Sequence, residues 1–231
     1  MTMKGFNGFP TQSIPFLQDL AGHNDREWFE ANKHNYESYI REPALAFIEE
    51  MAPKLQGLST QFHAIAKKTG GSLMRVYRDT RFSKDKTPYK INIGIQFRHI
   101  LGKDVHAPGF YLHIEPGECF IGAGIWHPES KTLAKIRNFI TDNPAAWQAA
   151  LSQSAFRRNF QLVGDSLVRP PKGFPADHPL IEDLKRKDFI ALKAFDCDEI
   201  VKPAFSNFVT RGFKQADPLM RYLCAAVEVN Y

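Results

Sequence analysis

Cysteine is scarce in this chain of 231 residues, and its three cysteines stand far apart, at Cys119, Cys197 and Cys224. An odd number of distant cysteines predicts neither a disulfide framework nor the CxxC pair of a zinc clip. We therefore expect three reduced, buried thiols.

Long apolar runs are also absent. No stretch of about eighteen uncharged apolar residues occurs, so no membrane-spanning helix is predicted. The first twelve residues, MTMKGFNGFPTQ, lack the apolar run that a signal peptide needs. These absences favour a cytoplasmic protein with no membrane partner.

The common motifs of nucleotide and hydrolase sites are missing as well. The sequence contains no GxxxxGK[ST] loop, no GxGxxG after a strand and no GxSxG elbow. The short GAG run at 122–124 leads into Ile125 and Trp126 rather than into a helix start. No cofactor and no nucleophilic mechanism are predicted from motifs.

Apolar and aromatic residues are plentiful. They make up 43% and 13% of the chain, with 19 Phe among them, and such a composition is typical of a globular protein with a sizeable buried core. No linker or internal repeat divides the chain, so we expect a single domain over residues 1–231.

The periodicity changes twice along the chain and predicts an α+β fold: a mainly antiparallel sheet of about four to six strands in the middle, flanked by N-terminal and C-terminal helices. Three helices are expected before residue 57. The expected strands are 72–77, 91–97, 110–116, 118–126 and 188–195. Later helices are expected from Pro128, from Asn143, and over 203–214 and 217–228.

The middle strands offer polar side chains on one face each, and Pro116-Gly117 predicts a tight antiparallel turn between two of them. If the faces coincide, they form a polar surface with a glycine-floored hollow beside aromatic walls. The residues concerned are Arg75, Tyr77, Asn92, Gln96, Arg98, Tyr111, His113, Glu115, Phe120, Gly122, Gly124 and Trp126. Sequence alone does not fix the register on which this depends.

The net charge of +5 is concentrated in one segment. Residues 67–103 carry ten basic and two acidic side chains, whereas residues 1–66 have a net charge of −3 and residues 104–231 are neutral. A localised positive field of this kind attracts an anion.

The centre of that segment is the stretch YRDTRFSKDKTPYK, residues 77–90. Its Arg side chains offer planar forks that suit phosphate or carboxylate, and its Lys side chains supply point charges. The interleaved Tyr77, Phe82 and Tyr89 are expected to fix the stretch to the body of the protein. The alternative is a structural loop held by its own salt bridges, with Asp79 and Asp85 paired to the cations.

The predicted ligand-binding residues combine these cations with aromatic side chains that can stack on bases. They are Arg75, Arg78, Arg81, Lys84, Lys86, Lys90, Arg98, Tyr77, Tyr89, Tyr111 and Trp126.

His113, Glu115 and Asp79 are the candidates for proton transfer. A His two residues from a carboxylate on one strand face can form an acid–base pair, although a solvated or salt-bridged pair is the alternative. His99 and His106 precede His113 at regular intervals, but regular spacing is not metal-ligand geometry and no Cys or second carboxylate accompanies them. No metal site is predicted.

Five stretches carry a resemblance to a known family. They are GFP near the N-terminus, NDREWFEANK, VYRDTRFSKDKTPYKINIG, PGFYLHIEPGECFIGAGIW and RPPKGFPADHPLIEDLKRKDFIA. Together they resemble the uncharacterised domain-of-unknown-function family 2461 over nearly the whole chain, from about Phe6 to Ala225. The resemblance implies a single-domain soluble protein of a kind found in bacteria and fungi, with no established activity or cofactor. This chain has Gly122-Ala123-Gly124 where the family often has three glycines, and Val168 where it more often has Lys.

Three hypotheses about function follow. The first is a protein that binds a phosphate-bearing ligand, nucleotide or nucleic acid, through the basic loop at 75–90. The second is an enzyme that acts on an anionic small molecule, with His113, Glu115 or Asp79 in proton transfer. The third is a module on which an acidic protein partner docks.

Overall fold

A six-stranded antiparallel sheet lies at the centre of the computed structural model, which describes residues 5–102 and 107–231. The strand order is β1-β2-β3-β4-β6-β5. The strands are β1 (Phe62–His63), β2 (Ile93–His99), β3 (Gly109–Glu115), β4 (Glu118–Ile125), β5 (Gln161–Val163) and β6 (Phe189–Ala194). The predicted α+β class, with an antiparallel sheet in the middle and helices toward both ends, is confirmed.

Helices precede and follow the central strands along the chain. The first group is α1 (Ser13–Gly22), α2 (Arg26–Ala31), α3 (Lys33–Tyr36), the π-helical turn η1 (Glu37–Arg41) and α4 (Glu42–Gln56). The second group is α5 (Ser130–Asp142), α6 (Pro144–Ser152), α7 (Ser154–Arg157), α8 (Ile181–Leu184), the 3₁₀ turn η2 (Cys197–Val201) and α9 (Phe205–Ala226). Asp25 caps α2 by accepting a hydrogen bond from the Trp28 backbone N–H at 2.9 Å.

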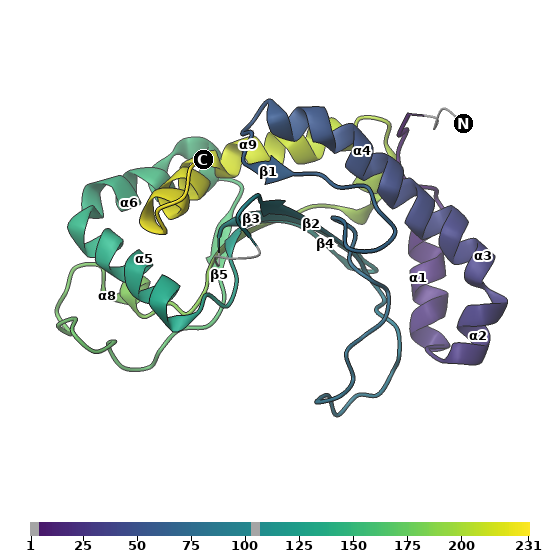
Figure 1. Cartoon of the computed structure of the whole chain (residues 1–231), viewed down its shortest axis with the longest axis horizontal. Coiled ribbons are helices and arrows are strands. Elements are labelled where there is room, and N and C mark those ends of the chain that lie inside the picture. Colours follow the sequence, from purple (N-terminus) through teal and green to yellow (C-terminus); the bar gives the residue numbers. More distant parts are fainter. Residues whose placement is uncertain (1–4, 103–106) are drawn as a thin grey trace.

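One face of the sheet is packed into the core. The strands bury alternate side chains because successive residues of a strand point to opposite faces. Helices α4 and α9 cover this face (Figure 1). Phe213 of α9 lies against Phe110, with 4.5 Å between ring centroids, and against Phe97. This contact explains why the apolar half of each central strand is buried.

The opposite face of the central strands carries the polar side chains. Gln96 pairs with Tyr111, Tyr111 with Gly122 and Gly122 with Leu192, so these four residues form one row across β2, β3, β4 and β6. The next row contains Gly94, His113 and Phe120. The register therefore confirms that the polar faces of three predicted strands coincide. The tight turn at Pro116-Gly117 joins β3 to β4 as predicted, with Gly117 at φ +83°.

The segment 72–92 departs from the prediction. Residues 72–77 were expected to form a strand, but only isolated bridges occur, Leu73 to Ile95 and Tyr77 to Tyr89. The segment instead forms a long ribbon that extends away from the sheet on the side opposite α4 and α9 (Figure 1). Alternating apolar residues predict an extended backbone, but they do not say whether a partner strand is available. Strands β1 and β5 were not predicted, because two or three residues show no period.

The closing helix is another correction. Two helices were expected near its position, but α9 is continuous over 22 residues and contains Pro218. Proline inside a helix removes one backbone hydrogen bond and costs about 3 kcal/mol. The buried stripe of α9 runs through Phe213, Ala216 and Met220, on both sides of the proline. Packing of this stripe against the sheet and neighbouring helices offsets the cost.

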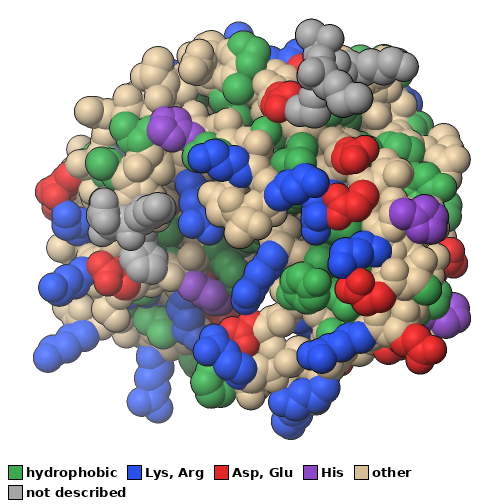
Figure 2. Space-filling view, turned by 45° about the vertical axis from the view of Figure 1, so that its right-hand side comes forward, with side chains coloured by type: hydrophobic (Ala, Val, Ile, Leu, Met, Phe, Trp, Pro, Cys, Tyr) green, Lys and Arg blue, Asp and Glu red, His purple; other side chains and the backbone are tan. Residues whose placement is uncertain are grey.

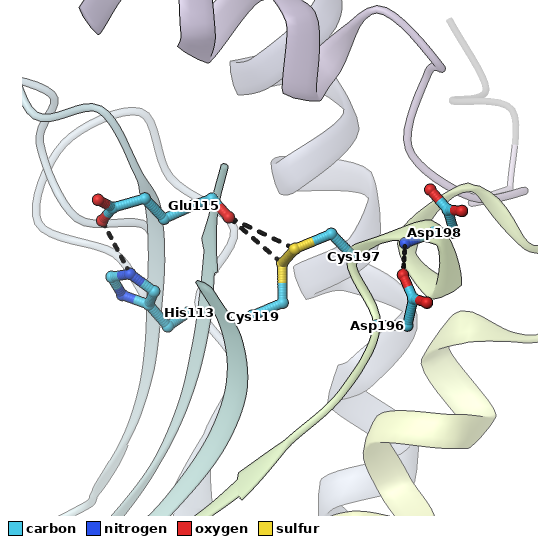
Figure 3. The surroundings of a disulfide bond; sticks show 6 residues. All are labelled: His113, Glu115, Cys119, Asp196, Cys197 and Asp198. Atoms are coloured by element: carbon cyan, nitrogen blue, oxygen red, sulfur yellow. Dashed lines mark hydrogen bonds and ion pairs between the residues drawn. A yellow bond between two sulfur atoms is a disulfide. The ribbon is translucent and has the colours of Figure 1, made fainter. Parts of the chain in front are cut away.

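The cysteines are also a correction. Cys119 at the start of β4 and Cys197 at the start of η2 form a disulfide, with 5.5 Å between their Cα atoms (Figure 3). The expectation of three reduced thiols is wrong for these two. They are 78 residues apart in the sequence, and they meet because β6 pairs with β4 and η2 follows directly after β6. Cys224 is a free, buried thiol as expected.

Among the described residues, no helix combines the length and the apolar character that crossing a bilayer requires.

Candidate functional site

A cavity of about 990 Å³ lies on the polar face of the sheet. Strands β2, β3, β4 and β6 form its floor, and the base of the 72–92 segment and the residues after β4 form its walls. The lining side chains include Met74, Lys90, Asn92, Gln96, Arg98, Tyr111, His113, Phe120, Trp126, Glu129, Ile190 and Leu192, together with Gly122 and Gly124. The hollow predicted from strand alternation therefore exists, with aromatic walls.

His113 occupies the middle of a hydrogen-bonded chain in this cavity. Its Nε2 lies 3.0 Å from Glu115 Oε2, and Figure 3 shows the Glu115 carboxylate turned toward the ring. Its Nδ1 lies 3.2 Å from both Tyr111 Oη and Asn92 Nδ2. An ionised carboxylate can only accept, so in the neutral ring Nε2–H donates to Glu115 and Nδ1 accepts from the tyrosine and the amide.

The neighbours of His113 fix the orientation of its ring. Phe120 stacks on it with 4.6 Å between centroids and nearly parallel planes. Burial raises the pKa of Tyr111 to about 12, so its hydroxyl keeps its proton and remains a donor at neutral pH. Gly94 makes room for this hydroxyl, because a Cβ at position 94 would lie 2.7 Å from Tyr111 Oη.

Two of the predicted cations line the cavity. Lys90 stands before β2, and Arg98 stands near the end of β2. From Asn92, two residues after Lys90, to Arg98 the extended chain measures about 20 Å, so the two cations lie at opposite ends of the strand. Arg98 Nε donates to Gln96 Oε1 at 3.1 Å. Burial and then the nearby Arg75 guanidinium lower the pKa of Lys90. Among the described residues, no carboxylate lies within ion-pair distance of Lys90.

The cations of the loop tip are arranged differently. Arg81 forms a bidentate pair with Asp79, at 2.9 and 2.7 Å, and Arg78 pairs with Asp85. Hydrogen bonds from these arginines lower the pKa of both carboxyl groups to about 2. Lys86 donates to the Thr80 carbonyl at 2.8 Å. Arg78 and Arg81 are therefore paired with carboxylates of the loop itself, as the alternative interpretation of a salt-bridged loop predicts.

The remaining loop cations, Arg75 and Lys84, are exposed, and neither belongs to an ion pair within the described part of the chain. Asp79, the third candidate for proton transfer, lies in the loop and outside the cavity lining. The structure thus brings Lys90, Arg98, Tyr111, His113 and Trp126 to one cavity, with Glu115 bonded to His113. It does not bring the loop tip there.

The loop aromatics have different roles. Tyr89 is buried and stacks on Phe29 at 4.0 Å between centroids, and the Asn24 side chain bonds both its backbone N–H and its carbonyl at 3.0 Å. Tyr89 therefore fixes the loop to the N-terminal helices, as predicted. Phe82 does not, because it is 95% exposed at the tip. Tyr77 packs beside Tyr89 and is half exposed.

Several site features were not found from the sequence. Ile190 and Leu192 alternate along the predicted strand 188–195, but only the pairing of β6 with β4 shows that they line the cavity. Asp188 is buried and accepts hydrogen bonds from the backbone N–H groups of His127 and Asp165, at 2.7 and 2.9 Å. It thereby fastens the chain just after Trp126, and no sequence pattern predicted it.

Among the described residues, the histidines do not form a metal cluster. His99 is buried, with Nε2 2.9 Å from the Asn230 carbonyl and Nδ1 accepting from the Leu101 N–H. His106 lies outside the described residues. Within residues 5–102 and 107–231, no group of three or more His, Cys, Asp or Glu side chains is arranged to hold a metal ion.

Comparison with known proteins finds one family whose model matches most of the chain, including the whole cavity. A family model described as "Conserved hypothetical protein (DUF2461)" matches residues 12–222. No curated protein and no solved structure matches the chain. The matched region contains every residue of the cavity described above.

Proposed function

The chain belongs to the DUF2461 family of conserved hypothetical proteins, and from this premise we propose that it binds a small phosphate-bearing ligand in the cavity on the polar face of the sheet. The observation that supports this most is Lys90. It is a partly buried cation in the cavity wall, without a carboxylate at ion-pair distance among the described residues, beside hydrogen-bond donors that suit phosphate oxygens.

The electrostatics of Lys90 favour an anion. Removing an ammonium group from water and placing it near a second cation both disfavour its charged form, as the lowered pKa of Lys90 reflects. A bound phosphate would offset both effects. Charge-assisted hydrogen bonds to phosphate are roughly twice as strong as neutral ones. The Asn92 amide, which also lines the cavity, can supply a further donor.

The cavity also favours a small ligand over nucleic acid. Its volume of about 990 Å³ lies at the upper end of the range for small-molecule sites. Nucleic-acid affinity depends on many free cations, yet Arg78 and Arg81 are already paired with carboxylates. Lys and Arg side chains do gather along the lower edge of the molecule in Figure 2. A salt-dependent gel shift with DNA or RNA would support binding along that edge instead.

Titration calorimetry tests the proposal. Wild-type protein is titrated with phosphate monoesters and, as controls, with the corresponding alcohols. We expect only the esters to bind, and Lys90→Gln to weaken them at least tenfold, or about 1.4 kcal/mol. Lys84→Gln is the matched control, because Lys84 is an exposed cation outside the cavity. Equal loss in both variants would point to general charge attraction and contradict the proposal.

A second candidate function is acid–base catalysis on the bound anion, favoured by the Glu115–His113 hydrogen bond. His113 Nδ1 faces Tyr111 and Asn92 in the cavity and can take a proton there, while Glu115 stabilises the resulting imidazolium. If the protein turns over a phosphate ester, ³¹P NMR will detect the product. His113→Gln is then expected to abolish turnover while ester binding persists. Turnover that survives this change would exclude the role.

We also propose a cytoplasmic location, and the Cys119–Cys197 disulfide is the observation that counts against it and offers a test. Thiol pools keep most cytoplasmic cysteines reduced, whereas oxidising compartments preserve disulfides. Alkylation of thiols in freshly lysed cells, followed by mass spectrometry, distinguishes the two. Alkylated Cys119 and Cys197 would support a cytoplasmic location, and an intact disulfide would contradict it.

A further inference from the structure

The cavity is polarised along a diagonal of the sheet. The Tyr111 hydroxyl and the Asn92 amide lie beside Gly94, and Lys90, two residues before Asn92 in the chain, also lines the cavity. Gly122 lies two strands across from Gly94 and one row further along, Leu192 follows it in the same row on β6, and Ile190 is one row beyond Leu192. From strand spacing and rise, Gly94 and Gly122 are about 12 Å apart. The end at Gly94 therefore suits an anion, and the strip over Gly122, Leu192 and Ile190 suits an apolar group, with the charged Arg98 and Glu129 side chains elsewhere in the lining.

The backbone conformation does not require glycine at position 122. The backbone there is not left-handed, and a Cβ would lie 3.3 Å from Leu192 Cδ2 and 3.4 Å from Tyr111 Cβ, so that an alanine requires these side chains to move by a few tenths of an ångström. Gly124 differs, because it has φ +126° and its Cβ would lie 2.0 Å from the Phe189 carbonyl oxygen. Gly122 is buried between Leu192 and Tyr111, and the absence of a side chain there keeps this part of the cavity floor low.

Trp126 follows directly after the end of β4 and forms part of the cavity wall. It lines the cavity, yet its side chain remains 68% exposed, and His127 stacks on it at 4.3 Å between centroids. The chain beside it is held by the buried Asp188 carboxylate, which bonds the His127 N–H and ring Nδ1. A large, exposed indole whose backbone is held in place can stack on a flat ring of a ligand.

We infer that the cavity selects phosphate esters of a flat ring system, with the phosphate at Lys90 and Asn92 and the ring over Gly122 against Trp126. The inference rests on the proposed function and adds the class of ligand: a nucleoside monophosphate, whose ring and phosphate are joined by one sugar, spans the two ends. Gly122 and Trp126 are the specificity-determining residues. Stacking of a base on an aromatic side chain contributes to binding without regard to base identity.

The experiment compares AMP, UMP, ribose 5-phosphate and adenosine by titration calorimetry. The difference between AMP and adenosine measures the need for phosphate, which is the proposed function. The difference between AMP and ribose 5-phosphate measures the need for a ring, which is this inference. We expect AMP and UMP to bind at least tenfold more tightly than ribose 5-phosphate.

Variants then locate the ring. Trp126→Ala and Gly122→Ala are each expected to weaken AMP at least fivefold and to leave ribose 5-phosphate unchanged. Phe82→Ala is the matched control, since Phe82 is an exposed aromatic outside the cavity. Trp126→Ala keeps the test valid if Gly122→Ala does not fold, because Trp126 is mostly exposed.

Each possible failure has its own meaning. Equal binding of AMP and ribose 5-phosphate, or an effect of Phe82→Ala as large as that of Trp126→Ala, would overturn the inference and leave the proposed function standing. Equal binding of AMP and adenosine would overturn the proposed function instead. Absence of binding by all four compounds would overturn both.

Discussion

At the scale of single residues, cations that look alike in the sequence differ in whether they form an ion pair with a carboxylate. Arg81 and Lys90 are both cations of one basic segment, but Arg81 has a carboxylate partner two residues away and Lys90 lines the cavity. The sequence shows the Asp79–Arg81 spacing, and a salt-bridged loop was one of its two interpretations. It does not show which cations face the sheet, because that depends on the path of the whole 72–92 segment.

The loop ion pairs predict a specific response to acid. The folded-state pKa values of Asp79 and Asp85 lie near 2, below the ordinary value of 3.8. Stabilisation of the loop by these pairs is therefore complete above about pH 4 and is lost as the pH falls toward 2. NMR titration of the carboxyl carbons measures this. Arg81→Gln is expected to raise the pKa of Asp79 toward 3.8 and leave Asp85 unchanged; equal shifts at both would contradict separate pairs.

Cys224 gives a second prediction. Burial raises the pKa of its thiol to about 12, so the reactive thiolate is scarce at pH 8. The native protein is expected to react with a thiol-specific chromogen over hours, and the denatured, unreduced protein to show one fast thiol. Reduction before denaturation should reveal three. Three fast thiols without reduction would contradict the disulfide.

At the scale of elements, strand β4 contains two glycines for different reasons. Gly124 holds a left-handed conformation against the Phe189 carbonyl, whereas at Gly122 the φ is not left-handed and a Cβ would be tight only against the Leu192 and Tyr111 side chains. Both glycines belong to the same GAG run, and from the sequence both were predicted to form the floor of the hollow. Only the pairing of β4 with β6 distinguishes them, since β6 supplies the carbonyl that excludes a side chain at position 124.

A matched pair of variants tests this difference. Gly124→Ala forces an alanine into a strained conformation and a backbone clash, and is expected to lower the free energy of unfolding by more than about 2 kcal/mol. Gly122→Ala is expected to change it by less than about 1 kcal/mol. Urea unfolding followed by circular dichroism measures both. Similar losses would mean that Gly122 is also required by the fold.

The disulfide connects two elements that the sequence leaves far apart. It joins the start of β4 to η2, where Asp196 caps the turn by accepting from the Asp198 N–H (Figure 3). Both sulfur atoms also approach the Glu115 carbonyl oxygen, at 3.6 and 3.4 Å. The bond therefore braces the hairpin end from which Glu115 reaches His113.

Reduction of this bond is expected to lower stability. Closing a loop of 78 residues restricts the unfolded chain, and the expected stabilisation is about 4 kcal/mol. Urea unfolding with and without a phosphine reductant measures the difference. Cys224→Ser with the disulfide intact is the control for reductant effects on the free thiol. An unchanged midpoint on reduction would contradict a stabilising bond.

At the scale of the whole molecule, the sequence predicted the class of fold and the polar face, and it missed what depends on long-range placement. Alternation over 91–97 and 110–116 was enough to select one face of β2 and β3, because the side-chain period of a strand is two. The strand status of 72–77, the continuity of α9 through Pro218 and the Cys119–Cys197 bond each depend on contacts between distant segments. Local patterns do not encode such contacts.

A crystal structure grown with AMP tests the central claim most directly. The claim is that the cavity, and not the basic loop tip, holds the phosphate. We predict phosphate density within hydrogen-bond distance of Lys90 Nζ and Asn92 Nδ2, with the ring over Gly122. Phosphate bound to Arg75 and Lys84 on the exposed loop, with an empty cavity, would contradict it.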